Sequence, residues 1–145
     1  MTVPLGAIGR GLAAGFAGTV ALTVSQRIEM RLTGRPPSDL PAQVAEGVLG
    51  ISPRGKRRAQ VAFATHWFNN TSSGLTRAAL GAAGVSGAPA LAGSFSLYLG
   101  GEYLMFARLG LAPRTLREAA PRFAIDVVHA AVWAGVTNAA YEWLA

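Results

Sequence analysis

The stretch AQVAFATHWFNNTSSGLT, residues 59–76, contains no Asp, Glu, Lys or Arg. As an α-helix it would be about 27 Å long, close to the roughly 30 Å thickness of a bilayer's hydrocarbon core. A histidine and two asparagines nevertheless lie in its middle, within THWFNN at residues 65–70. The stretch therefore predicts a membrane helix that carries polar side chains for a purpose.

Other parts of the chain repeat this pattern. Charge-free runs also cover residues 11–26, 78–101 and 127–141. Only 14% of the 145 residues are charged, against roughly 25% in an ordinary soluble domain. We predict an all-α integral membrane four-helix bundle that forms a single polytopic domain; a soluble bundle of unusually apolar helices is the alternative. The helices are expected at about 5–32, 60–83, 89–110 and 122–144.

The basic residues predict the orientation. Eleven of the 13 Lys and Arg residues lie in or beside two connections, between Arg27 and Arg58 and between Arg108 and Arg122. Because cytoplasmic loops collect Lys and Arg, we expect a multi-pass protein of the bacterial inner membrane with both termini outside. A nucleic-acid binder would interleave its basic residues with aromatics or place them along an exposed helix. No nucleic-acid partner is expected, despite the net charge of +6.

The first connection predicts a short interfacial helix at about 41–50, which Pro41 can open. Leu40, Val44, Val48 and Ile51 would face the membrane, with Gln43 and Glu46 toward water. The basic residues of both connections would either only set the topology or also bind lipid headgroups. Those assigned to this cytoplasmic basic surface are Arg54, Lys56, Arg57, Arg58, Arg114 and Arg117.

Small residues are spaced for close contact between the helices, which is how helices associate in lipid. We expect packing within the chain; a dimer motif is the alternative. The small residues are Gly11, Gly15 and Gly18, then Gly74, Ala78 and Gly81, then Ala131, Gly135 and Ala139.

Ionisable groups are expected to share one depth. At 1.5 Å per residue, His66 and His129 each lie about 10 Å in from the cytoplasmic end of their helix. Polar groups inside the hydrocarbon are costly and turn toward partners or water, so we predict one intramembrane polar site. Its members would be Glu29, His66, Asn70, Glu102, Asp126 and His129.

Several roles are open for this site. It could bind or conduct a proton or small cation, with histidine titrating near neutral pH. It could instead only hold the helices together, in a non-catalytic scaffold or accessory subunit of a membrane complex. A further alternative is haem b or a divalent metal bound by His66 and His129, although no cofactor is the main expectation. The chain has no Cys, phosphate-binding glycine loop or nucleophile elbow, so we expect no enzyme.

The expected partners are membrane lipid and further protein. Four small helices enclose little space, so a homo-oligomer or a larger membrane complex is an open expectation. At the opposite end of the bundle, Arg77 is expected either to extend toward the interface or to pair with Glu142.

Several stretches resemble, in order, the YagU-like family of small bacterial inner-membrane proteins. They are GLAAGFAGTVAL with IEMRLTGRPPS, THWFNNTSSGLTRAALG, LAGSFSLYLG with GLAP, and DVVHAAVWAG. The distinctive features are the first helix ending near Glu29, the Pro36–Pro37 pair, Thr65–His66 and the acidic residue before His129. The resemblance implies a polytopic helical fold and no particular activity. The chain lacks the family's basic N-terminal segment, so the orientation is taken from its own charges.

Overall fold

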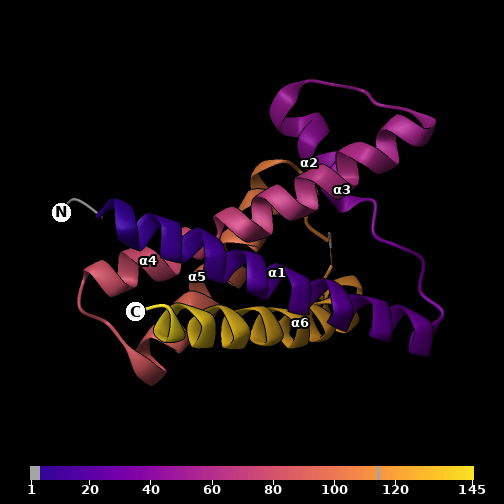
Figure 1. The fold of residues 1–145 in the computed structure, drawn as a ribbon. Coiled ribbons are helices and arrows are strands. Elements are labelled where there is room, and N and C mark those ends of the chain that lie inside the picture. Colours follow the sequence, from indigo (N-terminus) through magenta and orange to yellow (C-terminus); the bar gives the residue numbers. More distant parts are fainter. Residues whose placement is uncertain (1–3, 114) are drawn as a thin grey trace.

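The described part of the chain is helical throughout its regular structure. The computed structural model describes residues 4–113 and 115–145 (Figure 1). The helices within these ranges are α1 (Leu5–Thr33), α2 (Leu40–Leu49), α3 (Gly55–Ser72), α4 (Gly74–Ala82), α5 (Gly87–Arg108) and α6 (Leu116–Trp143).

Helices α1 and α6 pack extensively against each other and lie side by side in opposite directions (Figure 1). Helix α4 packs against α1, and α5 packs against α6 and α4. Helix α3 leads into α4 but packs chiefly on α1 and on α2. The all-helical expectation is confirmed. The helix expected at 60–83 is in fact two helices, α3 and α4, and it begins earlier, at Gly55.

The second helix is broken at Ser73, and local hydrogen bonds explain where the break falls. Ser72 Oγ donates to the carbonyl oxygen of Phe68 at 2.6 Å, and Ser73 Oγ donates to that of Asn69 at 2.8 Å. Serine hydroxyls that bond back to the preceding turn are known to bend helices. Gly74, which follows, is a weak helix former. As a result α3 points away from the bundle while α4 lies along α1.

The glycines of α1 allow its backbone to touch α4. A Cβ at Gly11 would lie 2.8 Å from the Cβ of Ala78, and one at Gly74 would overlap the carbonyl oxygen of Gly11. A Cβ at Gly15 would overlap the carbonyl oxygen of Thr71. The expected packing of small residues within the chain is therefore present between these helices.

The small residues expected to pack in α6 are on the wrong face. Ala131 and Ala139 are exposed, and a Cβ at Gly135 would meet no atom within 4 Å. The buried face of α6 is the neighbouring one, which carries Ala130, Trp133 and Ala134. The Trp133 ring stacks on that of Tyr98, with 4.2 Å between the centroids. Regular spacing of small residues does not identify which face of a helix is covered when another face also carries small and aromatic residues.

The outer surface of the bundle is strongly apolar. Among the described residues, two helical stretches, Leu5–Thr33 and Ala119–Trp143, are long and apolar enough to cross a membrane. Only 39% and 33% of their most apolar windows are buried inside the molecule. The large apolar side chains that point outward include Phe16, Val24, Ile28, Phe63, Phe68, Leu97, Leu104 and Val128. Exposed large apolar side chains on several helices are typical of contact with lipid or another protein.

The contact between α1 and α3–α4 is tested by adding a single methyl group. We expect Gly15→Ala to lower the free energy of unfolding by roughly 1–3 kcal/mol, because the new Cβ overlaps the α3 backbone. Gly9→Ala in the same helix is the matched control, since a Cβ there meets nothing within 4 Å. Unfolding of the detergent-purified variants would measure the difference. Equal stability of the two variants would contradict the packing.

Candidate functional site

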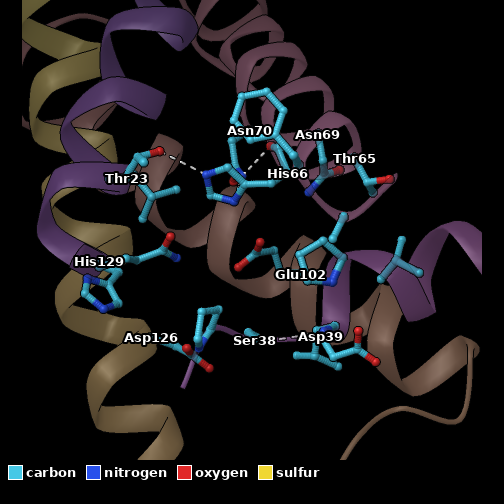
Figure 2. Close-up of a pocket in the computed structure, with 18 of the residues that line it drawn as sticks. Thr23, Ser38, Asp39, Thr65, His66, Asn69, Asn70, Glu102, Asp126 and His129 are labelled. Carbon is cyan, nitrogen blue, oxygen red and sulfur yellow. Dashed lines mark hydrogen bonds between the residues drawn. The ribbon is translucent and has the colours of Figure 1, made fainter. Parts of the chain in front are cut away.

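A cavity of about 850 Å³ lies where α3 diverges from the rest of the bundle (Figure 2). Its walls come from α1, α3, α5 and α6, and from the start of α2 with the segment before it. Exposed residues such as Arg27, Ser38, Asp39 and Pro121 line it at the loop end, so the cavity opens there.

Most of the predicted polar site lies on this cavity. His66, Asn70, Glu102, Asp126 and His129 all line it, and they come from α3, α5 and α6. Figure 2 shows Glu102 between the side of α3 that carries His66 and the side of α6 that carries His129.

Glu29 is the member of the predicted site that does not line the cavity. The chain turns back after α1 at Gly34, which has a left-handed φ of 71°. This turn brings Arg35 onto Glu29, with Nη2 2.6 Å from Oε2. The hydrogen bond to Glu29 raises the pKa of Arg35. Glu29 therefore holds the turn that follows α1. Its contact with the site is the one with His129, whose Nε2 lies 3.9 Å from Glu29 Oε2.

A chain of hydrogen bonds lines the deep wall of the cavity. His66 Nε2 lies 3.0 Å from Thr23 Oγ1, and His66 Nδ1 lies 3.2 Å from Asn70 Nδ2. Tyr98 donates to Asn70 Oδ1 at 2.5 Å, and Trp133 Nε1 donates to the carbonyl oxygen of Asn70 at 3.2 Å. These bonds join α1, α3, α5 and α6 and fix the His66 ring.

His129 is buried in α6 and is only partly satisfied. Its Nδ1 lies 2.9 Å from Ser25 Oγ. Its Nε2 is buried with no hydrogen-bond partner, and the nearest carboxylate oxygen, Glu29 Oε2, is 3.9 Å away. One polar atom at the cavity wall therefore has unused hydrogen-bonding capacity.

The two carboxylates on the cavity differ in their partners. Asp126 accepts a hydrogen bond from Tyr103 at 2.9 Å and lies 3.5 Å from Arg122 Nε. Glu102 has no Lys or Arg nitrogen within 4.0 Å among the residues that the structure describes. Glu102 is therefore the carboxylate of the cavity that no basic side chain neutralises.

Among the residues assigned to the basic surface, Arg58 forms ion pairs within the chain, which its sequence context did not predict. It binds Asp39 at 2.5 Å and also pairs with Glu46 of α2. We call these three residues the Arg58 cluster. The hydrogen bond from Arg58 lowers the pKa of Asp39. The cluster fixes α2 on α3, so that α2 covers part of the cavity.

The orientation expected for α2 is also wrong in part. Leu40 and Val44 line the cavity instead of facing outward, while Val48 and Ile51 are exposed as expected. Acidic side chains that bind Arg58 turn the helix inward, which its amphipathic pattern alone does not predict.

Four other residues of the predicted basic surface form no ion pair with a side chain that the structure describes, and one cannot be placed. Arg54, Lys56, Arg57 and Arg117 are exposed. Arg114 lies outside the described residues.

The opposite end of the bundle is closed. Arg77 is only 2% exposed, with Nε 2.8 Å from Asn138 Oδ1 and Nη2 3.5 Å from Glu142 Oε1. Its guanidinium lies over the Tyr141 ring, 4.2 Å from the centroid. Of the two expectations for Arg77, pairing with Glu142 is the one observed.

Polar residues of the site that were not predicted include Thr23, Ser25, Asp39 and Tyr98. Thr23 and Ser25 could have been found, since they are hydroxyl residues six and four positions before Glu29 in a largely apolar run. The sequence does not distinguish Tyr98, as a hydrogen-bonding residue of the site, from an aromatic residue that only packs in the core. Asp39 depends on a loop whose path the sequence does not define.

Comparison of the chain with protein-family models, curated proteins and solved structures gives no match. The resemblance to the YagU-like family therefore stays a prediction. No three His, Asp or Glu side chains in the described part of the chain lie close enough together to hold a metal ion. The haem and metal alternatives also stay predictions.

The Arg58 cluster should make the position of α2 depend on pH. Since Arg58 lowers the folded-state pKa of Asp39, the carboxylate stabilises the fold above its unfolded pKa of about 3.9. That contribution is lost as the pH falls through the lower folded value. We expect the hydrogen-exchange protection of α2 amides, corrected for intrinsic rates, to fall below about pH 4.

Two substitutions test the same cluster at neutral pH. Arg58→Met should reduce the protection of α2 because Asp39 and Glu46 lose their shared partner. Arg57→Met is the matched control, since Arg57 is exposed. Equal protection of α2 in the two variants would show that the cluster does not hold the helix.

Proposed function

We propose that the chain is a small integral membrane protein whose cavity binds a proton or small cation and takes part in its transport. In this proposal α1, α3 with α4, α5 and α6 cross the bilayer of the bacterial inner membrane. The cavity would then open to the cytoplasm, on the side of the two basic connections.

The apolar outer surface supports the membrane location. Phe68 is 77% exposed on α3 and Ile28 is 53% exposed on α1. In water such side chains would destabilise the fold by the cost of their exposed apolar area, whereas in lipid they have a matching solvent. Helices expose this surface on several sides of the bundle, which an interface with one partner would not require.

The lack of a basic partner for Glu102 among the described residues is the main support for the proposed site. This carboxylate lies in a largely apolar cavity and has no Lys or Arg nitrogen within 4.0 Å among the described residues, so a bound proton or cation would supply the counter-charge that it lacks. The titratable side chains that line the cavity with Glu102 include Tyr98, Asp126, Arg122, His129 and His66.

The two ends of the bundle support a transport role. The loop end is open to the cavity, while Arg77, Asn138 and Tyr141 fill the other end. A site that is open to one side only is what alternating access requires in each of its end states. On the deep wall, Thr23 and Asn70 would hold His66 in place, so that its imidazole can exchange a proton with Glu102.

Topology can be tested with single cysteines, because the chain contains none. Ser52 and Ser86 are both exposed, in the connections at opposite ends of the bundle. We expect Ser86→Cys to react with a membrane-impermeant maleimide in spheroplasts, and Ser52→Cys to react only after permeabilisation. The reverse pattern would invert the orientation. Recovery of the protein in the soluble fraction without detergent would contradict the membrane location.

Transport can be tested in proteoliposomes by measuring proton flux under an imposed pH gradient. Glu102→Gln should reduce the protein-dependent flux about tenfold or more, because the amide cannot exchange a proton. His66→Ala and His129→Ala should also reduce it, by breaking the contacts with Thr23 and Ser25.

Glu142→Gln is the charge-matched control, since Glu142 lies at the closed end and does not line the cavity. It should retain most of the flux. Absence of flux from the folded wild-type protein, with proton and with sodium or potassium gradients, would reject the transport function.

A further inference from the structure

The cavity is much larger than a proton or metal cation requires. A water molecule occupies about 30 Å³ of liquid volume, whereas this cavity measures about 850 Å³. Cavities of roughly 300–1,000 Å³ are typical of sites for small organic molecules. The volume therefore fits an organic ligand with one charged group.

Most of the cavity wall is apolar or aromatic. Such a wall gains free energy by covering the carbon atoms of a ligand, and aromatic rings also attract a cation over their faces. The largest apolar side chains that line it are Met30, Phe63, Trp67, Met105, Phe106 and Ile125.

The charge of the ligand follows from the acidic residues. Asp39 is bound by Arg58, and Asp126 lies beside Arg122, so both have a basic partner. Among the described residues, Glu102 is the cavity carboxylate that no Lys or Arg approaches within 4.0 Å. The arginines that line the cavity do not change this conclusion, since Arg35, Arg58 and Arg122 each pair with a carboxylate and Arg27 is exposed at the loop end. A cation at the deep wall would supply the partner that Glu102 lacks.

The α3 wall of the cavity includes an exposed aromatic side chain. Phe63 lines the cavity and is 63% exposed, so a large apolar side chain is available to a ligand at the α3 wall. The next apolar side chain outward on α3, Phe68, is 77% exposed and does not line the cavity.

We infer that the cavity binds lipophilic organic cations, with the positive charge at Glu102 and the apolar body against the aromatic residues of α3 and α5. This inference rests on the proposed function and names the substrate class of the same site. The cation and the proton would compete for one carboxylate, which would couple their movements.

Tetraphenylphosphonium and tetraphenylborate test the inference, since they share size and shape and differ in the sign of their charge. Equilibrium dialysis would be done with the full chain in lipid nanodiscs, with empty nanodiscs as the blank. We expect the wild-type protein to bind the phosphonium about tenfold or more tightly than the borate. This comparison needs no variant, so it does not depend on the folding of one.

Glu102→Gln should remove the preference, and Glu102→Asp should keep part of it because the charge remains. Glu142→Gln, at the closed end, should leave the phosphonium affinity unchanged. Equal binding of the two ions, binding of neither, or a preference that survives Glu102→Gln would overturn the inference.

The two proposals can fail separately. Proton flux from a protein that binds no phosphonium would overturn the organic-cation inference and leave the proton site standing. Binding of phosphonium that depends on Glu102, in a protein without any flux, would reject transport and retain the binding site.

Discussion

The close contact of α1 with α4 is the constraint on which the rest of the structure depends. Glycines at positions 11, 15 and 74 let the two backbones touch, and side chains there would force the helices apart. Once α4 is fixed on α1, the break at Ser73 decides where α3 goes. Helix α3 cannot stay parallel to the bundle, and the space that it leaves beside α5 and α6 becomes the cavity. One tight contact at one end thus produces an open site at the other.

The all-helical class was accessible from the sequence because helix length and charge-free runs depend on local composition. The limits of α1 match the prediction to within one residue at either end. The polar site was also accessible in part. Depth along a helix follows from residue number, and His66, Glu102 and His129 do line one cavity.

What could not be predicted depends on tertiary contacts. The turn at Gly34 takes Glu29 out of the cavity wall by giving it Arg35 as a partner. Arg58 pairs with Asp39, a residue on the other side of α2 in the sequence, and the distribution of charges did not predict this ion pair. The rotation of α6 about its axis was also ambiguous, since two of its faces carry small residues. In each case the sequence identifies the residues, but it does not show with which of several possible partners they are in contact in the folded chain.

The pattern of ion pairs gives Glu102 its significance. Pairing a carboxylate with arginine lowers the cost of placing it in or near an apolar environment, although the pair itself adds little stability. Elsewhere in the described part of the chain, acidic side chains at the cavity and at the helix ends follow this rule: Glu29 with Arg35, Asp126 with Arg122 and Glu142 with Arg77. A purely structural carboxylate would gain from the same arrangement. Glu102 has no such arginine partner among the described residues, although it lies in the cavity with aromatic side chains and two histidines. A carboxylate without a basic partner lowers the stability of the fold, but it leaves a site at which a positive charge can bind and be released.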